Sequence, residues 1–367
     1  MKMSRMVFYC LLVGAMNCLG QTRQEAFQLD LQSHGWHVDQ GVLNGSSLPQ
    51  TMDFSDDGSL WVAFPVEASK ALQTRDQSSA GYKGKILHLA QTGSVLAECG
   101  TDALQWEYLR LFAQRTEGFT LDAADKIITY DIHCKEMAQY PTGMRIGTAF
   151  SPDRSLIYTR SRDNNIHVLR NGNLQVLKAF DLPEGVKWKP VLFGDESVIF
   201  PITVQTKSCY QTQLTRMDVK TGKNEPWTTL ECTRYNLLGD DHIIYTSLKG
   251  DSPLEIIGKD GVSTAAYKPP KDAYIDRAVL DRRYPVVSPQ SLRVVEELIE
   301  AKGRHPSLDM SGKFVGRDIV LLDMHAGTAL LTVKVPLSTQ VYSYALSRDG
   351  KRLAVLLDSQ LAVYQVP

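Results

Sequence analysis

Basic and aromatic side chains recur where short apolar segments of this sequence begin. A guanidinium group binds a carboxylate through two parallel hydrogen bonds, and aromatic rings line the apolar walls of ligand pockets. If these positions converge in space, they form a concave site for a small anionic or sugar-like ligand. The alternative is that the rings pack between structural units and the basic groups are only solvated. The predicted ligand-binding residues are Arg145, Lys187, Trp188, Arg234, Tyr235, Tyr274, Arg277 and Tyr342.

An internal repeat must position these residues. Its clearest copy is the segment LSRDGKRLAV at 346–355, and related copies are FSDDGSLW at 54–61 and FSPDRSLI at 150–157. In each copy Asp caps a tight turn through its side-chain oxygen, and Gly, where present, supplies a positive φ. The apolar run that follows each turn predicts a buried strand.

The spacing of the repeat predicts the architecture. Units of four strands that recur every ~40 residues are typical of propeller blades. We place the first turn of each unit near Asp57, Glu117, Asp153, Asp195, Asp241, Asp281 and Asp349. The predicted fold is therefore all-β, a seven-bladed β-propeller of four-stranded antiparallel blades. The innermost strands would then begin at one mouth of the central channel.

The last unit is one strand short, because the chain ends after its third strand. The alternating segment at 25–31 precedes blade one and supplies the missing outer strand, which closes the ring. Two units are long and predict insertions at 66–82 and 288–316. In the second insertion Ser288 precedes Pro289, and Leu292, Val295 and Leu298 share one helical face. This pattern predicts an amphipathic helix ending at Gly303 that packs on its blade or forms a lid or partner surface.

The Phe-Ser-Pro-Asp copy at 150–153 and the Leu-Ser-Arg-Asp-Gly-Lys-Arg-Leu-Ala copy at 346–354 resemble the repeats of TolB-type, WD-repeat-like bacterial propellers. The resemblance spans most of residues 51–367. It implies the propeller fold and no particular chemistry, since one fold hosts many functions.

The N-terminus predicts the compartment. Lys2 and Arg5 precede an apolar run at 6–15, and small residues lie before Gln21, which is the pattern of a signal peptide over residues 1–20. The mature chain, residues 21–367, would be one propeller domain, secreted or periplasmic. No other stretch approaches the ~20 apolar residues of a membrane span.

Four cysteines remain after signal cleavage, an even number for an oxidising compartment. If the strand after Cys209 turns at Thr221–Gly222 and returns to Thr233, Cys209 and Cys232 lie nearly opposite each other. Cys99 and Cys134 then pair by elimination, joining blades one and two.

Charge excludes one class of partner. The whole chain has 40 basic and 41 acidic residues, and loss of Lys2 and Arg5 leaves 38 against 41. This balance does not predict nucleic-acid binding. We expect a monomer that binds an unknown protein or a small ligand, with no cofactor.

Catalytic signatures are missing from the sequence. It contains no Gly-x-Ser-x-Gly elbow, no His-Glu-x-x-His and no phosphate-binding glycine loop. The favoured function is a non-catalytic binding or interaction protein. The alternative is a propeller hydrolase or lactonase with a divalent metal in the channel, for which Glu107, Asn236, Asp276 and Asp281 are the candidate ligands.

Overall fold

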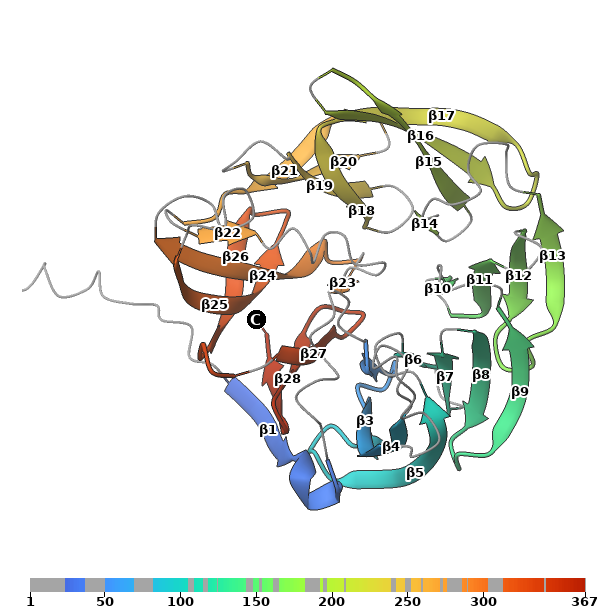
Figure 1. Cartoon of the computed structure of the whole chain (residues 1–367), viewed down its shortest axis with the longest axis vertical. Coiled ribbons are helices and arrows are strands. Elements are labelled where there is room, and N and C mark those ends of the chain that lie inside the picture. Colours follow the sequence, from blue (N-terminus) through green and yellow to red (C-terminus); the bar gives the residue numbers. More distant parts are fainter. Residues whose placement is uncertain are drawn as a thin grey trace, which may run out of the picture.

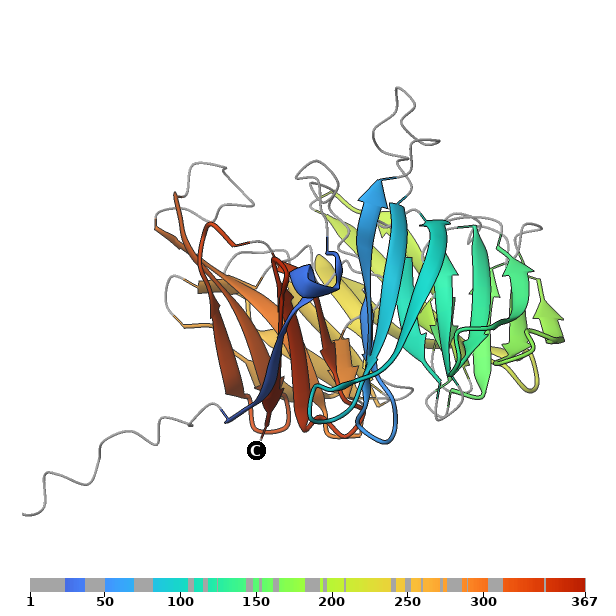
Figure 2. The ribbon, with the colours of Figure 1, turned by 90° about the horizontal axis from the view of Figure 1, so that it is seen from below.

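The computed structural model describes residues 24–36, 50–68, 82–104, 109–114, 118–123, 125–142, 148–151, 154–160, 165–181, 192–193, 197–207, 209–238, 242–247, 252–258, 260–270, 273–275, 286–288, 290–302, 313–339 and 341–366. In these ranges the strands form seven antiparallel sheets arranged as a ring (Figure 1). The strands run along the axis of the ring, so the disc is about one strand thick (Figure 2). The predicted all-β, seven-bladed propeller is confirmed.

Blades one to four follow one another along the chain, each with its innermost strand first. Blade one contains β2 (Met52–Phe54), β3 (Leu60–Ala68), β4 (Tyr82–Leu89) and β5 (Val95–Leu104). Blade two contains β6 (Leu109–Ala113), β7 (Gly118–Ala123), β8 (Lys126–Asp131) and β9 (Glu136–Pro141). Blade three contains β10 (Thr148–Phe150), β11 (Leu156–Arg160), β12 (Ile166–Arg170) and β13 (Val176–Phe180). Blade four contains β14 (Leu192–Phe193), β15 (Ser197–Gln205), β16 (Tyr210–Asp218) and β17 (Asn224–Glu231).

The remaining three blades complete the ring. Blade five contains β18 (Thr233–Leu237), β19 (His242–Ser247), β20 (Leu254–Gly258) and β21 (Ser263–Tyr267). Blade six contains β22 (Ala273–Ile275), β23 (Val286–Ser288), β24 (Arg293–Lys302), β25 (Lys313–Asp323) and β26 (Thr328–Val335). Blade seven contains β27 (Val341–Leu346), β28 (Arg352–Leu357), β29 (Gln360–Gln365) and the N-terminal β1 (Gln24–Asp30).

The inner strands are apolar on both faces because every blade packs against two neighbours. In β28, Leu353 and Val355 lie in the core cluster shared with blade six, whereas Ala354 and Leu356 lie in the cluster shared with blade one. Successive side chains of a strand point to opposite faces, so a continuous apolar run fills both interfaces. The hydrophobic core is therefore a set of layers between blades.

The N-terminal strand closes the ring, as predicted. β1 pairs antiparallel with β29, with Leu29 opposite Leu361 and Asp30 opposite Gln360. A single 3-10 turn, η1 (Leu31–His34), follows, capped by the Asp30 side chain. Fully buried Leu31 and the Trp36 ring then pack into the core between blades seven and one. Figure 1 shows β1 on the outside of blade seven.

Two sequence-based expectations for blade six are wrong. The predicted helix after Ser288 is strand β24, which pairs with β22, β23 and β25. Residues 294–298 are buried on both sides of the strand, so packing against blades five and seven overrides the helical spacing of the apolar residues. The turn placed near Asp281 instead lies at 290–292, between β23 and β24. Asp281 and Gly303 lie outside the described residues.

The two predicted insertions are partly strand. β3 continues to Ala68 and β4 begins at Tyr82, so only residues 69–81 of the first insertion lie outside the described ranges. In the second, the same holds for Pro289 and residues 303–312. The extra length in both units therefore extends long hairpins of the blade.

Both predicted cysteine pairs are at disulfide distance. Cys209 and Cys232 flank the hairpin of β16 and β17, with Cα atoms 5.5 Å apart. Cys99 on β5 and Cys134 in the turn after β8 join blades one and two, with Cα atoms 5.7 Å apart.

A β-bulge recurs between the two outer strands of all seven blades. In blade one, His88 pairs with Ala97 and Leu89 with Val95, so Leu96 is the extra residue. The extra residues of blades one to seven are, in order, Leu96, Met137, Leu177, Trp227, Thr264, Leu330 and Ala26. Bulges twist an edge strand and discourage pairing with another chain.

Ring closure makes a testable prediction at Gly93. This residue has φ +88°, and a Cβ there would lie 2.7 Å from the Phe27 ring of β1. Gly172 has φ +96° with no atom within 4 Å of a Cβ, so it is the matched control. Each alanine substitution costs about 1 kcal/mol of backbone strain, and we expect Gly93→Ala to cost at least about 1 kcal/mol more. Urea unfolding measures both, and equal losses would contradict the proposed contact.

Candidate functional site

The innermost strands begin at one end of the channel. Gln50, just before β2, forms a parallel bridge with Arg110 on β6. Innermost strands also contact each other between blades three and four, four and five, six and seven, and seven and one. Of the predicted ligand-binding residues, the structure describes Arg234 and Tyr235 on β18, Tyr274 on β22 and Tyr342 on β27. Arg145, Lys187, Trp188 and Arg277 lie outside the described residues.

Two of the four described residues pack in the core. Tyr342 is 9% exposed, and its ring meets Trp36 edge-on with centroids 4.8 Å apart. Tyr235 packs against the cluster between blades four and five that contains Leu237 and Ile243. Burial raises the pKa of the Tyr342 and Tyr235 hydroxyls. Arg234 and Tyr274 are partly exposed at this end.

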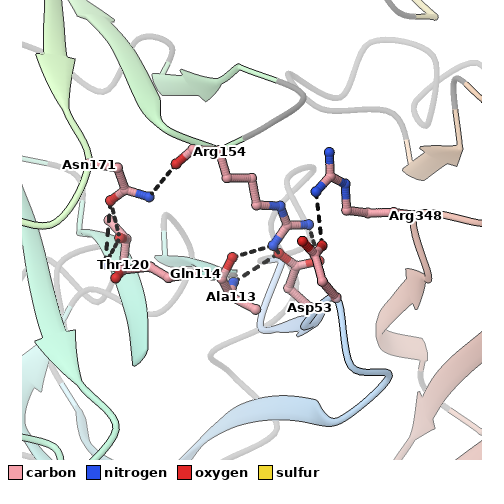
Figure 3. A network of polar contacts seen from close by, with 8 residues as sticks. Asp53, Ala113, Gln114, Thr120, Arg154, Asn171 and Arg348 are labelled. Carbon is pink, nitrogen blue, oxygen red and sulfur yellow. Dashed lines mark hydrogen bonds and ion pairs between the residues drawn. The ribbon is translucent and has the colours of Figure 1, made fainter. Parts of the chain in front are cut away.

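The opposite end of the channel holds a polar network that joins three blades (Figure 3). Arg154, in the turn between β10 and β11, donates to both carboxylate oxygens of Asp53 on β2, at 2.6 and 3.1 Å. Asp53 also accepts from the backbone N–H of Ala113 on β6, at 2.9 Å, and Arg154 donates to the Ala113 carbonyl. One arginine of blade three therefore binds blades one and two together.

Arg154 occupies a strained backbone position. Its φ is +56°, and in the repeated turn it aligns with Gly58 and Gly350, which have φ +79° and +72°. A non-glycine residue in this region costs about 1–2 kcal/mol. The contact with Asp53 offsets that cost, which explains why an arginine stands where the repeat has glycine. The sequence signal for this residue is that Arg154 stands at the repeat position occupied by glycine in the copies that contain Gly58 and Gly350.

The Asp53 carboxyl is buried between the blades. Burial raises its pKa, and the Arg154 guanidinium together with the Ala113 N–H opposes that shift. A buried carboxylate with a bidentate guanidinium partner is strongly destabilised when the partner is removed. The ion pair therefore links blades one and three near the channel, and the Asp53 carboxylate is already bound by Arg154.

The network continues between blades two and three. Asn171 accepts from the Thr120 hydroxyl at 3.1 Å and from the Gln114 amide at 3.4 Å, and it donates to the Arg154 carbonyl at 2.9 Å. Figure 3 shows Asn171, Thr120 and Gln114 to the left of the Arg154 guanidinium. They hold the turn that presents Arg154 to Asp53.

Further arginines join blades six, seven and one at the same end. Arg348 pairs with Asp56 at 2.9 Å, and Arg352 donates to the carbonyls of Gly58 and Gln91. Arg293 on β24 donates to the carbonyl of Gly350 at 2.8 Å. These guanidinium groups therefore join neighbouring blades at this end of the channel.

A serine, histidine and aspartate lie together in blade one but do not form a catalytic triad. His88 bonds the Ser59 hydroxyl at 2.8 Å, and Ser59 donates to Asp57 at 2.6 Å. In a triad the aspartate orients the histidine, whereas here it accepts from the serine. Ser59 and His88 are buried, and Trp61 stacks on the imidazole with ring centroids 4.0 Å apart. Burial lowers the pKa of His88.

No metal centre is visible in the part of the chain that the structure describes. Those residues contain no group of three or more His, Cys, Asp or Glu side chains that could hold an ion. Of the candidate metal ligands, Asn236 is buried on β18, and Glu107, Asp276 and Asp281 lie outside the described ranges. The described residues also contain no helix with the length and hydropathy of a membrane-crossing helix.

Comparisons with known proteins support the fold alone. No protein-family model matches the sequence, and no curated protein matches it. One chain of a structure entitled "Crystal Structure of Mitotic Checkpoint Complex" is similar, with a TM-score of 0.53 and 13% identity over 99% of each chain. The protein is thus a seven-bladed β-propeller, and this solved structure shares its fold. No sequence family supports the TolB-type resemblance.

The Arg154 position makes the second prediction. Arg154→Ala leaves the buried Asp53 carboxylate without its ion pair, so we expect the free energy of unfolding to fall by about 3–5 kcal/mol. Arg154→Gly loses the same pair but relieves the positive φ, so it should cost about 1–2 kcal/mol less than Arg154→Ala. Urea unfolding compares the two variants.

The double variant Asp53→Asn/Arg154→Gly separates charge burial from strain. The double variant removes both charges. Its loss of unfolding free energy should therefore be smaller than the sum of the losses of Asp53→Asn and Arg154→Gly measured separately. Additive losses would show that Asp53 and Arg154 do not interact.

Proposed function

We propose that this protein is an extracytoplasmic β-propeller that binds a small anionic or sugar-like ligand at the mouth where the innermost strands begin. The observation that carries this proposal is the closed ring, which brings the starts of seven strands from distant parts of the sequence to one end. Arg234 and Tyr274 are partly exposed there, and they supply a guanidinium and an aromatic ring for a carboxylated or sugar-like ligand.

Placement outside the cytoplasm rests on two observations. Residues 1–20 have the pattern of a signal peptide. The cysteine pairs Cys99–Cys134 and Cys209–Cys232 are at disulfide distance, as expected for an oxidising compartment. The TolB-type resemblance belongs to this proposal and rests on the repeats at 150–153 and 346–354.

The mouth makes the third prediction. Arg145→Ala/Arg234→Ala should weaken binding of an acidic sugar or a carboxylate, because each charged hydrogen-bonded pair contributes about 1.5–3 kcal/mol, or about 10- to 150-fold in affinity. Thermal-shift titration with glucuronate, galacturonate and citrate identifies a ligand of the wild type, and calorimetry then compares affinities.

The charge-matched control is Lys223→Ala/Lys351→Ala, which removes two exposed cations that do not lie at the start of an innermost strand. It should keep the wild-type affinity. Equal affinity of the arginine and lysine double variants for the ligand would contradict the proposed binding site at the mouth. The absence of a thermal shift of the wild type with all three ligands would contradict it as well. One divalent ion bound per chain in metal analysis would instead favour the hydrolase or lactonase alternative.

A further inference from the structure

The extra residue of the recurring β-bulge differs in polarity and burial from blade to blade. In blades four, six and seven the extra residues Trp227, Leu330 and Ala26 are partly buried and pack against core clusters. In blade five the extra residue is Thr264, which is polar and exposed. In blades one, two and three the extra residues are apolar and exposed, at 57% for Leu96, 59% for Met137 and 43% for Leu177. Three consecutive blades therefore present an apolar side chain at the same register position.

Neighbouring residues enlarge this apolar area. Val95 and Val176 precede two of the bulge residues and are 41% and 44% exposed, and Ile132, in the turn before β9, is 40% exposed. We use the name rim surface for Val95, Leu96, Ile132, Met137, Val176 and Leu177. β5, β9 and β13, which carry most of it, are the outer strands of adjacent blades (Figure 1).

The rim surface is held rigidly. The Cys99–Cys134 pair joins β5 to the turn that carries Ile132, and Cys134 itself lies three residues before Met137. Tyr140 on β9 hydrogen-bonds His167 on β12, and Thr129 on β8 donates to the Gly172 carbonyl at 2.6 Å, so blade two is also fixed to blade three. A surface that is already ordered loses little entropy on binding, which favours tight association.

The charges beside the rim surface decide the class of partner. Lys135 and Glu136 are of opposite sign, and Glu98 pairs with Lys85 at 2.6 Å. Lys178 is committed to the carbonyls of Val219 and Lys220. Among the other exposed neighbours, Arg170 is basic and His133 is titratable, whereas Gln91, Thr92, Ser94, Asn173 and Gln175 are uncharged. An anionic membrane or a nucleic acid selects a uniformly basic surface, whereas an apolar centre with a polar border that carries both signs of charge is typical of protein interfaces.

We propose that the rim surface is a docking site for a partner protein that presents an uncharged apolar surface to blades one, two and three. Exposed apolar patches mark interaction sites in soluble proteins, and here exposed apolar side chains recur at one register position of three adjacent blades. Leucine and methionine are suited to this role, and methionine adapts its shape to the partner. This site is separate from the channel mouth and does not depend on ligand binding there.

The test begins with photo-crosslinking in cells that naturally produce the protein. A benzophenone amino acid is placed in the full chain at position 96, 137 or 177, and at position 264 as the control. We expect one adduct of the same mass from the first three positions and none from position 264. No adduct, or adducts of unrelated masses, would overturn the proposal, and an adduct of twice the chain mass would replace the partner by a second copy.

Affinity then tests the contact directly. The adduct is identified by mass spectrometry, and the purified partner is titrated with wild type, with Leu96→Lys/Met137→Lys/Leu177→Lys and with Thr264→Lys. We expect the triple variant to raise Kd by about 30-fold or more and the control to leave it unchanged. Because all four positions are exposed, thermal unfolding should confirm that every variant is folded. Equal Kd values, or flotation of the wild-type protein with phosphatidylcholine or phosphatidylglycerol vesicles, would overturn the proposal.

Discussion

The pairing of β1 with β29 is the interaction on which the rest of the structure depends. Each blade buries its two faces against its neighbours, so a ring with an incomplete blade would expose apolar residues on both sides of the gap. The N-terminal strand supplies the missing edge, and Leu31 and Trp36 continue the contact into the core between blades seven and one. Closure holds the first and last blades in register and so fixes both ends of the channel.

The two ends of that channel are used differently. At the end formed by the turns between first and second strands, Arg154, Arg348 and Arg352 bind carboxylates and carbonyls of other blades. At the opposite end the strand starts hold Arg234 and Tyr274, which are partly exposed. An arginine in a left-handed turn is tolerated only where a buried partner offsets its strain, as Asp53 does for Arg154.

Much of the fold could be predicted from local sequence, because tight turns with Asp and Gly punctuate apolar runs at a regular interval. The same local view failed at β24, where apolar residues spaced as in a helix are held as a strand by blades on either side. The proposed mouth was less predictable. Tyr235 and Tyr342 begin strands as expected, yet they pack between blades, because a strand position does not state which neighbour a ring will contact.

The sequence by itself determined the number of blades, the closing strand and the two cysteine pairs, since each follows from spacing along the chain. Only the tertiary structure decided which side chains meet across blades. Asp53 and Arg154 are 101 residues apart, and their ion pair exists because the ring brings three blades to one point. The same is true of Leu96, Met137 and Leu177, whose shared register position follows from bulges that hydrogen-bond pairing creates. Such contacts depend on the angle and height of neighbouring blades, which no local pattern encodes.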